Sequence, residues 1–351
     1  MIRPRCLTYS QAINEALRIA METDPGVLLL GEDIAGGGDR TADGVDEMGG
    51  VFGTTRGLQK AFPNRVIDTP ISEMGIVGMA VGAATTGLRP VVELMFIDFI
   101  GVCLDPLLNQ AAKFRYMFGG KVSVPMVVRT VTGAGMAAGA QHSQSLYGIT
   151  AGIPGLKTVI PATPRDAKGL LLAAIRDNDP VIFCEPKSLL FATGEVPEGD
   201  YEVPIGKARL VREGHDVSLI GMGATVRMCE QAAEMLAREG TSAEVLDLRS
   251  LAPLDEDAIL TTLAKTGRVV VVDEATPYCG IASDVAALCA ERGFDDLTAP
   301  VKRVTAPHAP APANKALEDA YMPSAAKIVT AVREQLRGRG ARLSLVQNTN
   351  G

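Results

Sequence analysis

Lys157-Thr-Val-Ile160 and Val181-Ile-Phe-Cys-Glu185 are two short apolar runs, and a helical pattern from Asp166 to Arg176 lies between them. A strand, a helix and a second strand in this order form a unit whose two strands run parallel. Parallel sheets carry helices on both faces, because each connecting helix packs back onto the sheet. The stretch therefore predicts an α/β fold with a doubly wound sheet.

The same alternation extends toward the N-terminus. The predicted strands there are residues 27–30, 66–68, 91–95 and 124–130, and the predicted helices are residues 73–86 and 98–117. Apolar runs of this length, separated by helical patterns, indicate one parallel sheet. Residues 1–185 are therefore predicted to form the first domain.

A stretch rich in proline and glycine interrupts the alternation. Residues 186–205 are polar, contain three prolines and two glycines, and are predicted to be an interdomain linker. Beyond them the predicted strands are residues 217–221, 243–248, 268–273 and 301–304, and the predicted helices are residues 224–238, 255–264, 281–292 and 323–336. They indicate a second, smaller doubly wound domain over residues 206–340, followed by a flexible polar tail, residues 341–351.

The composition excludes several classes of protein. The chain has 351 residues and a net charge of -7, whereas binding to nucleic acid requires a basic surface. No apolar run is long enough to predict a membrane span, and Met1 to Ser10 contains no hydrophobic signal core. The six cysteines form no CxxC pair, so zinc sites and disulfides are not expected. These features predict a globular protein of the cytoplasm.

Glu73 stands in Thr69-Pro-Ile-Ser-Glu-Met-Gly75, where a predicted strand passes into a predicted helix. Gly75, Gly78 and Gly82 recur along that helix and would let another backbone, a subunit or a ligand approach closely. A carboxylate in the first turn also complements the helix dipole. Spacing alone favours this second, plainer interpretation.

His142 lies in Ala140-Gln-His-Ser-Gln144, beyond a strand and a glycine-rich loop. In open α/β sheets, ligands bind at the carboxyl ends of the strands, and histidine gains or loses a proton near neutral pH. A histidine of a surface loop with a local hydrogen bond explains the pattern equally well. Phe99, in Phe96-Ile-Asp-Phe99, ends another strand. Its ring can stack on a heteroaromatic ring, although packing in the core is the more frequent role.

Two acidic side chains, Asp177 and Asp179, follow the predicted helix over residues 166–176. Free carbonyls at a helix C-terminus, together with carboxylates, can hold a monovalent or divalent cation. A plain C-terminal turn needs no ion, and spacing alone favours it.

These motifs resemble one family over nearly the whole chain, from about Leu7 to Leu336. It is the family of beta subunits of the thiamine-diphosphate-dependent first component of 2-oxo acid dehydrogenase complexes, of the acetoin and pyruvate dehydrogenase type. Several ordered motifs at the spacing of the family make the resemblance specific. They are Gly31-Glu-Asp33, Asp68-Thr-Pro-Ile-Ser-Glu73, Ala80-Val-Gly-Ala-Ala84, Gly87-Leu-Arg-Pro90, Gln141-His-Ser-Gln144, Pro154-Gly-Leu-Lys157, Ala173-Ala-Ile-Arg-Asp177, Asp247-Leu-Arg249 and Val272-Asp-Glu274.

The resemblance implies a transketolase-like pyrimidine-binding domain followed by a transketolase C-terminal domain. It also implies an alpha subunit as partner in an α2β2 heterotetramer, with thiamine diphosphate between the two kinds of chain. The sequence lacks GDG followed by NN, the signature that holds magnesium and the diphosphate in such enzymes. We therefore expect the alpha subunit to hold the magnesium. A lipoylated dihydrolipoamide acyltransferase is the second implied partner.

Residue roles also follow from the resemblance. Glu73 is expected to hydrogen-bond N1′ of the aminopyrimidine ring and so to activate the cofactor, while Ile71 and Phe99 contact that ring. His142 matches the active-site histidine, which gives or takes a proton during acyl transfer to a lipoyl group. A structural potassium, held mostly through carbonyls, is implied at Met126, Ala174, Ile175, Asp177 and Asp179. Asp179 departs from the asparagine of some relatives, a change that a backbone ligand tolerates.

The substrate is the least determined property. Pro307-His-Ala-Pro-Ala-Pro312 and Ala316-Leu-Glu-Asp-Ala-Tyr321 resemble acetoin dehydrogenase more than pyruvate dehydrogenase, so acetoin is predicted ahead of pyruvate. Ser145-Leu-Tyr147 discriminates only weakly against a branched-chain 2-oxo acid. A non-catalytic assembly scaffold is an alternative of another class, which the presence of both Glu73 and His142 disfavours.

Overall fold

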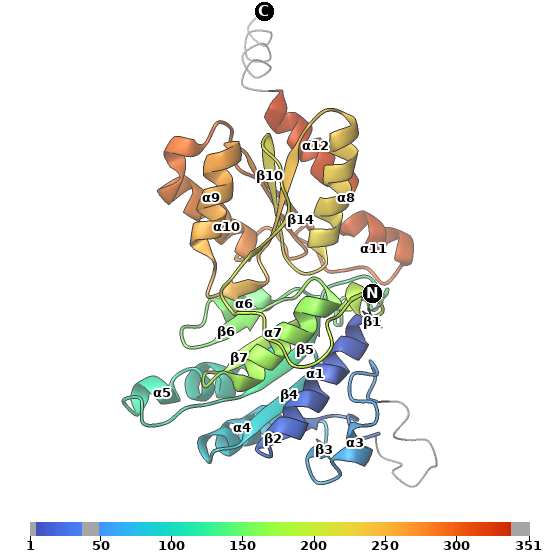
Figure 1. Ribbon diagram of the computed structural model, residues 1–351, viewed down its shortest axis with the longest axis vertical. Helices are drawn as coiled ribbons and strands as arrows, with labels where there is room; N and C mark the ends of the chain where they lie inside the picture. Colours follow the sequence, from blue (N-terminus) through green and yellow to red (C-terminus); the bar gives the residue numbers. More distant parts are fainter. Residues whose placement is uncertain (1–4, 37–48, 338–351) are drawn as a thin grey trace, which may run out of the picture. The chain divides into compact units, whose positions relative to one another are not determined.

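The computed structural model describes residues 5–36 and 49–337 of the chain (Figure 1). The chain divides into two compact units. The first unit takes in residues up to Lys207, Arg249–Leu254 and Pro310–Glu318, and the second takes in Ala208–Leu248, Asp255–Ala309 and the residues from Asp319 onward. The predicted tail, residues 341–351, lies outside the described residues.

The first unit is built on a seven-stranded sheet with the order β12-β6-β7-β5-β4-β2-β3. Its strands are β2 (Val27–Gly31), β3 (Val66–Asp68), β4 (Arg89–Phe96), β5 (Val127–Thr132), β6 (Lys157–Val159), β7 (Val181–Pro186) and β12 (Ser250–Ala252). All neighbours pair in parallel except β12, which is an antiparallel edge strand. The strand–helix–strand unit predicted from residues 157–185 is confirmed, since β6 and β7 are parallel neighbours.

Helices of the first unit begin where the sequence provides caps. Thr8 caps α1 (Tyr9–Thr23) through a reciprocal capping box with Gln11, and Thr163 caps α7 (Pro164–Arg176). α1 and α7 pack against each other along one face of the sheet (Figure 1). The other helices are α3 (Leu58–Ala61), α4 (Glu73–Thr85), α5 (Phe114–Met117) and α6 (Tyr147–Ala151).

The continuous helix predicted over residues 98–117 is wrong. The structure instead has a 3-10 helix, η1 (Ile97–Gly101), a π-helical segment, η2 (Pro106–Ala111), and the short α5. Pro106 has no backbone N–H, and its ring clashes with the preceding turn of an α-helix, so a regular helix is interrupted there. The interruption places Phe99 on a turn of its own, directly after β4.

Residues 186–205, which the composition predicts as a linker, pack on the first unit. They contain η3 (Lys187–Leu189) and β8 (Thr193–Glu195), and β8 pairs antiparallel with β1 (Cys6–Thr8). Tyr9 adds a backbone hydrogen bond to Ala192, with an N–O distance of 2.9 Å. These backbone bonds tie the stretch to the N-terminal strand, which explains why the first unit extends to Lys207.

The second unit contains a five-stranded sheet with the order β14-β13-β10-β11-β9, in which only β9 is antiparallel. Its strands are β9 (Arg209–Arg212), β10 (Val217–Gly221), β11 (Ala243–Asp247), β13 (Val269–Asp273) and β14 (Lys302–Thr305). Its helices are α8 (Thr225–Arg238), α9 (Glu256–Thr266), α10 (Ile281–Arg292), η4 (Phe294–Asp296) and α12 (Ala325–Leu336), and α11 (Lys315–Tyr321) spans the division between the units. The predicted two-unit α/β fold is confirmed. In the part of the chain that the structure describes, no helix has the length and apolarity needed to cross a bilayer.

Candidate active site

The side chains predicted to carry chemistry gather at the carboxyl edge of the first sheet. β2, β3, β4 and β5 run parallel, so their carboxyl ends lie at the same edge. Glu32 follows β2, Glu73 follows β3, Phe99 follows β4, and His142 follows β5 after a loop. Open α/β sheets bind their ligands at this edge.

Glu73 is the first residue of α4, and its side chain is partly exposed. Ser72 takes the capping position, but its hydroxyl makes no capping hydrogen bond. Among the described residues no donor side chain pairs with the Glu73 carboxylate, so it is available to a ligand. Ile71, two residues earlier, exposes 74% of its surface and is equally available for contact.

Negative charge is concentrated around Glu73. The pKa of Glu32 is raised by burial, and further by the charges of Asp33 and Glu73. Burial and the Glu73 charge also raise the pKa of the Cys103 thiol to about 12. The Cys103 Sγ lies 3.9 Å from the Phe99 carbonyl, so this thiol adjoins the turn that carries Phe99. The site therefore favours groups that bring a proton or a positive charge.

Aromatic rings surround His142. Its imidazole meets the Phe96 ring edge-to-face at 4.8 Å between centroids, and the Phe99 ring at 5.6 Å. Phe52 also packs edge-to-face with Phe96, at 5.6 Å between ring centroids. Perpendicular rings at these distances attract one another through their quadrupoles. Phe99 and His142, predicted separately from two motifs, are thus brought together.

Asp98 connects the two segments that carry these rings. Its Oδ1 accepts hydrogen bonds from the backbone N–H of Gln144 at 3.1 Å and from the side-chain amide of Gln144 at 2.9 Å. Asp98 belongs to η1, whereas Gln144 ends the loop that holds His142. The pair of bonds fixes the histidine loop relative to Phe99.

A buried ionic triad lies in the sheet behind this edge. Arg129 of β5 donates to Glu185 of β7 at 2.7 and 3.2 Å and to Glu93 of β4 at 3.0 Å. All three side chains are at most 8% exposed. Burial raises the pKa of Glu185, the Arg129 charge and hydrogen bond oppose that rise, and the Glu93 charge adds to it. The triad therefore buries two carboxylates against one guanidinium in the sheet that carries the predicted site.

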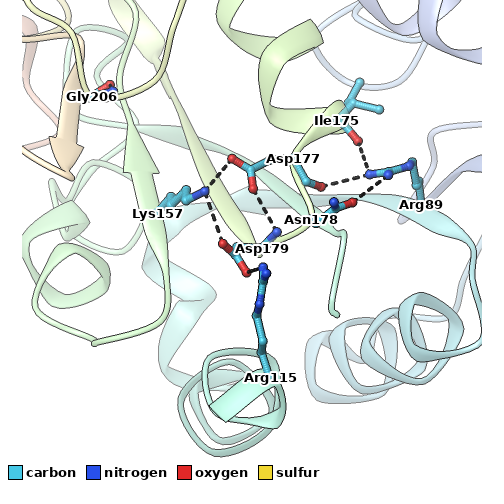
Figure 2. A network of polar contacts seen from close by, with 9 residues as sticks. Arg89, Arg115, Lys157, Ile175, Asp177, Asn178, Asp179 and Gly206 are labelled. Atoms are coloured by element: carbon cyan, nitrogen blue, oxygen red, sulfur yellow. Dashed lines mark hydrogen bonds and ion pairs between the residues drawn. The ribbon is translucent and has the colours of Figure 1, made fainter. Parts of the chain in front are cut away.

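Three residues of the predicted potassium site, Ile175, Asp177 and Asp179, lie together around the C-terminus of α7 (Figure 2). Arg89 points its guanidinium at two of the predicted ligand carbonyls, those of Ile175 and Asp177, at 3.1 and 2.9 Å. Its second nitrogen donates to the Asn178 side chain at 2.8 Å. A positive charge thus already occupies this helix end, as a helix dipole favours.

Hydrogen bonds and ion pairs engage the other predicted ligands of potassium as well. The Asp177 carboxylate pairs with Lys157 at 2.6 Å, and the Asp179 carboxylate pairs with Arg115 at 2.5 Å (Figure 2). The Met126 carbonyl accepts the backbone N–H of Val181, and the Ala174 carbonyl accepts that of Asp177. Within the described residues no group of three histidine, cysteine or acidic side chains is arranged to hold a metal ion. Potassium at this place remains a prediction.

The helix α4 presents an apolar face to the outside. From Met74 to Ala84 it contains only apolar residues and glycine, and its buried face is formed by Ile76, Val77, Ala80, Val81 and Ala84. On the other face Met74 and Met79 are 55% and 49% exposed, and open space lies next to Gly78 and Gly82. A helix that is apolar on all sides is normally covered on all sides. The open space next to these glycines is therefore sufficient for the close approach of a partner that the sequence predicts.

Comparisons with known proteins agree with this architecture. The family model "Transketolase, pyrimidine binding domain" matches residues 5–192, and "Transketolase, C-terminal domain" matches residues 206–328. The beta subunits of acetoin:2,6-dichlorophenolindophenol oxidoreductase from Bacillus subtilis and Cupriavidus necator are 57% and 54% identical to the chain over 335 residues, which cover 95% of it and 98% of each relative. The chain belongs to the family of thiamine-diphosphate-dependent dehydrogenase beta subunits.

Other members of the family are more distant. The pyruvate dehydrogenase E1 component subunit beta of Bacillus subtilis is 44% identical over 94% of this chain and 98% of its own. A solved structure, "Split gene transketolase, inactive beta4 tetramer", superposes with a TM-score of 0.74 over 94% of this chain and 98% of that chain at 24% identity. At that identity the similarity supports the transketolase-like fold alone. The family inferred from the sequence motifs is confirmed.

The sequence did not single out several residues that this dehydrogenase beta subunit brings to the site. Glu32 and Phe96 stand at strand ends within quoted motifs, so the rule that ligands bind at the carboxyl edge was sufficient to find them. Arg129 lies in a strand, and Lys187, whose ammonium donates to the His142 carbonyl, lies in the predicted linker. No local pattern marks either residue. Glu318, whose carboxylate accepts the backbone N–H groups of Gly135 and Ala137 in the loop before His142, comes more than 170 residues after His142, beyond the reach of any spacing argument.

Proposed function

We propose that this chain is the beta subunit of an acetoin dehydrogenase, active in an α2β2 heterotetramer with an alpha subunit. The observation that carries the proposal is that a carboxylate, Glu73, follows a strand at the same carboxyl edge of the sheet as two perpendicular rings, Phe99 and His142. The choice of acetoin rests on a comparison of two relatives from Bacillus subtilis. The beta subunit of its acetoin:2,6-dichlorophenolindophenol oxidoreductase is 57% identical to this chain, whereas the beta subunit of its pyruvate dehydrogenase E1 component is 44% identical.

Thiamine diphosphate, when bound between the two chains, supplies the carbon nucleophile that cleaves the substrate next to its carbonyl group. The residues of this chain fit its aminopyrimidine end. Glu73 would hydrogen-bond N1′ and hold a proton at that atom. Ile71 and Phe99 contact the ring and exclude water from it. The alpha subunit holds the magnesium and the diphosphate.

His142 is placed to move a second proton. We assign it to donating or accepting a proton while the acyl group passes to the lipoyl group of the dihydrolipoamide acyltransferase component. Its imidazole is partly exposed, whereas the Phe96 and Phe99 rings fix its orientation. Histidine suits this role because its proton affinity lies near neutral pH. Cytoplasmic location and potassium at the α7 C-terminus belong to the same proposal.

Co-expression with the alpha subunit tests the substrate. Reduction of 2,6-dichlorophenolindophenol is measured with acetoin, pyruvate and 3-methyl-2-oxobutanoate, and acetoin is expected to give the highest kcat/KM. A preference for either 2-oxo acid would move the chain to the corresponding alternative, a pyruvate or branched-chain 2-oxo acid dehydrogenase. No oxidation of any of the three would favour the non-catalytic scaffold.

Glu73→Gln tests the mechanism. The amide still reaches N1′ but cannot hold its proton, so we expect kcat to fall by about 10²-fold or more, while the heterotetramer still assembles. Glu22→Gln, on the exposed end of α1, is the matched control and should keep full activity. Near-normal activity of Glu73→Gln would remove this carboxylate from the mechanism. The isolated chain should bind thiamine diphosphate weakly in calorimetry, because it holds only half of the site.

A further inference from the structure

The loop from Gly133 to Gln144 carries His142 between β5 and α6, and two buried charged side chains hold its backbone. We propose that Lys187 and Glu318 are positioning residues that fix this loop, and with it the His142 imidazole, at the carboxyl edge of the first sheet. The inference rests on the proposed function, because it concerns the histidine assigned there to acyl transfer.

Lys187 holds the loop at His142 itself. It begins η3 directly after β7, and its side chain is only 1% exposed. The ammonium donates a hydrogen bond to the backbone carbonyl of His142 and lies 5.1 Å from the centre of the Phe96 ring. The same Phe96 ring packs edge-to-face on the His142 imidazole. Burial of an ammonium group is unfavourable unless hydrogen bonds or cation–π contacts compensate for the lost hydration. These contacts therefore fix the position of Lys187 as well as that of the loop.

Glu318 holds the first half of the loop. It belongs to the first unit and is completely buried. Its Oε1 accepts the backbone N–H groups of Gly135 at 2.8 Å and Ala137 at 3.0 Å, and its Oε2 also accepts that of Ala137 at 3.0 Å. Ala137 has a φ of 53°, a left-handed conformation that an alanine rarely adopts. The charge-assisted bonds from Glu318 offset the cost of that conformation.

Steric contacts leave this loop little room to shift. A Cβ atom at Gly135 would lie 2.9 Å from Cβ of Ser188, the residue after Lys187. A Cβ atom at Gly139 would lie 3.5 Å from Cβ of Ala313, in the segment that also carries Glu318. The two segments that supply the charges therefore also pack against the loop. Such a site presents its proton-transferring group in one place before the substrate arrives, which lowers the cost of reaching the reactive geometry.

Two assays on the assembled heterotetramer separate positioning from general damage. Lys187→Met keeps the length of the side chain but removes its charge, and Glu318→Gln keeps the shape of the carboxylate. Reduction of 2,6-dichlorophenolindophenol requires no lipoyl group, whereas acetylation of a purified lipoyl domain requires the step assigned to His142. We expect lipoyl acetylation to fall on the order of tenfold in both variants, while dye reduction changes less than about twofold.

His142→Asn and a second buried lysine provide the controls. His142→Asn should lower lipoyl acetylation at least as far, and adding Lys187→Met to it should cause no further loss of lipoyl acetylation. Lys168→Met removes another fully buried ammonium, which pairs with Glu15 away from the loop. It is expected to lower stability without changing the ratio of the two activities.

Hydrogen exchange gives a readout that does not depend on activity. Peptides spanning residues 133–144 should exchange their amide hydrogens faster in Lys187→Met and Glu318→Gln than in the parent enzyme. In Lys168→Met the exchange rate of these peptides should stay the same. If the enzyme oxidises none of the substrates but exchange rises, the proposed function fails and the fixing of the loop stands. Equal losses in both assays, additive losses with His142→Asn, or unchanged exchange would overturn the positioning role.

Discussion

Arg129→Met is the substitution that most directly tests the buried triad beneath the site. Methionine retains the aliphatic part of the arginine side chain but removes the charge that pairs with both Glu93 and Glu185. Because Arg129 is 3% exposed and its partners 8% and 1%, water cannot replace the lost contacts. Removing one partner from a buried ion pair costs about 3–5 kcal/mol, and here two carboxylates lose the same partner. We therefore expect a free energy of unfolding lower by about 3–5 kcal/mol at pH 8.

The cost should depend on pH in a defined direction. Burial already raises the pKa of Glu185, and Arg129 is what opposes the rise. Without Arg129 the pKa rises further, so the folded variant keeps a proton that the unfolded chain releases above about pH 4.3. A group with a raised folded pKa contributes stability at low pH and loses it as pH rises through the folded pKa. Arg129→Met should therefore be less destabilising at pH 5.5 than at pH 8.

Urea unfolding of the isolated chain, followed by circular dichroism, measures both effects. With a slope of about 2–3 kcal/mol per M, the loss at pH 8 corresponds to a shift of about 1–2.5 M in the transition of the first unit. The second unit lacks the triad and serves as an internal reference. Adding Glu93→Gln and Glu185→Gln to the variant should restore part of the loss. A cost below about 1 kcal/mol at pH 8, or one independent of pH, would refute the assignment of these groups as a buried ionic triad.

Two further predictions concern other parts of the first unit. Gly82→Ala should raise the free energy of unfolding of the isolated chain by about 0.5–1 kcal/mol, since a helical alanine has open space there, yet weaken association with the alpha subunit in sedimentation velocity. Unimpaired association would show that this face of α4 is not the contact. Arg89→Met should cost about 1–2 kcal/mol, because it removes donors from the carbonyls of Ile175 and Asp177. It should also widen the difference in Tm between potassium and sodium chloride, and equal Tm values in both salts would contradict a potassium site.

Local patterns were sufficient wherever one segment determines its own structure. The Thr8 capping box and the β6–α7–β7 unit follow from residues within a few turns of one another, and both are present. The edge rule likewise placed His142 at the carboxyl end of a strand, and Glu73 follows another strand of the same sheet, β3. The helix over residues 98–117 failed because apolar spacing outweighed Pro106, although a proline inside a helical pattern is itself a signal of interruption.

Long-range contacts account for what the sequence left out. Arg129 lies in an apolar run that predicts only a buried strand, and its role appears once β4 and β7 flank β5. Glu318 was noticed only as part of a segment resembling acetoin dehydrogenase. Its hydrogen bonds with Gly135 and Ala137, in the loop before His142, depend on the return of residues 310–318 to the first unit. No periodicity encodes a contact of that separation.

The helix α4 shows why Glu73 has two valid interpretations. Its residues are apolar on every side, so the sequence gives no amphipathic pattern and does not say which face is buried. In this chain one face packs on the sheet, while Gly78 and Gly82 leave the other open. Taken alone, Glu73 begins an ordinary helix and complements its dipole. Under the proposed function a second chain covers the open face, and the same carboxylate would then lie at a dry boundary, where the low dielectric strengthens a hydrogen bond to a ring nitrogen.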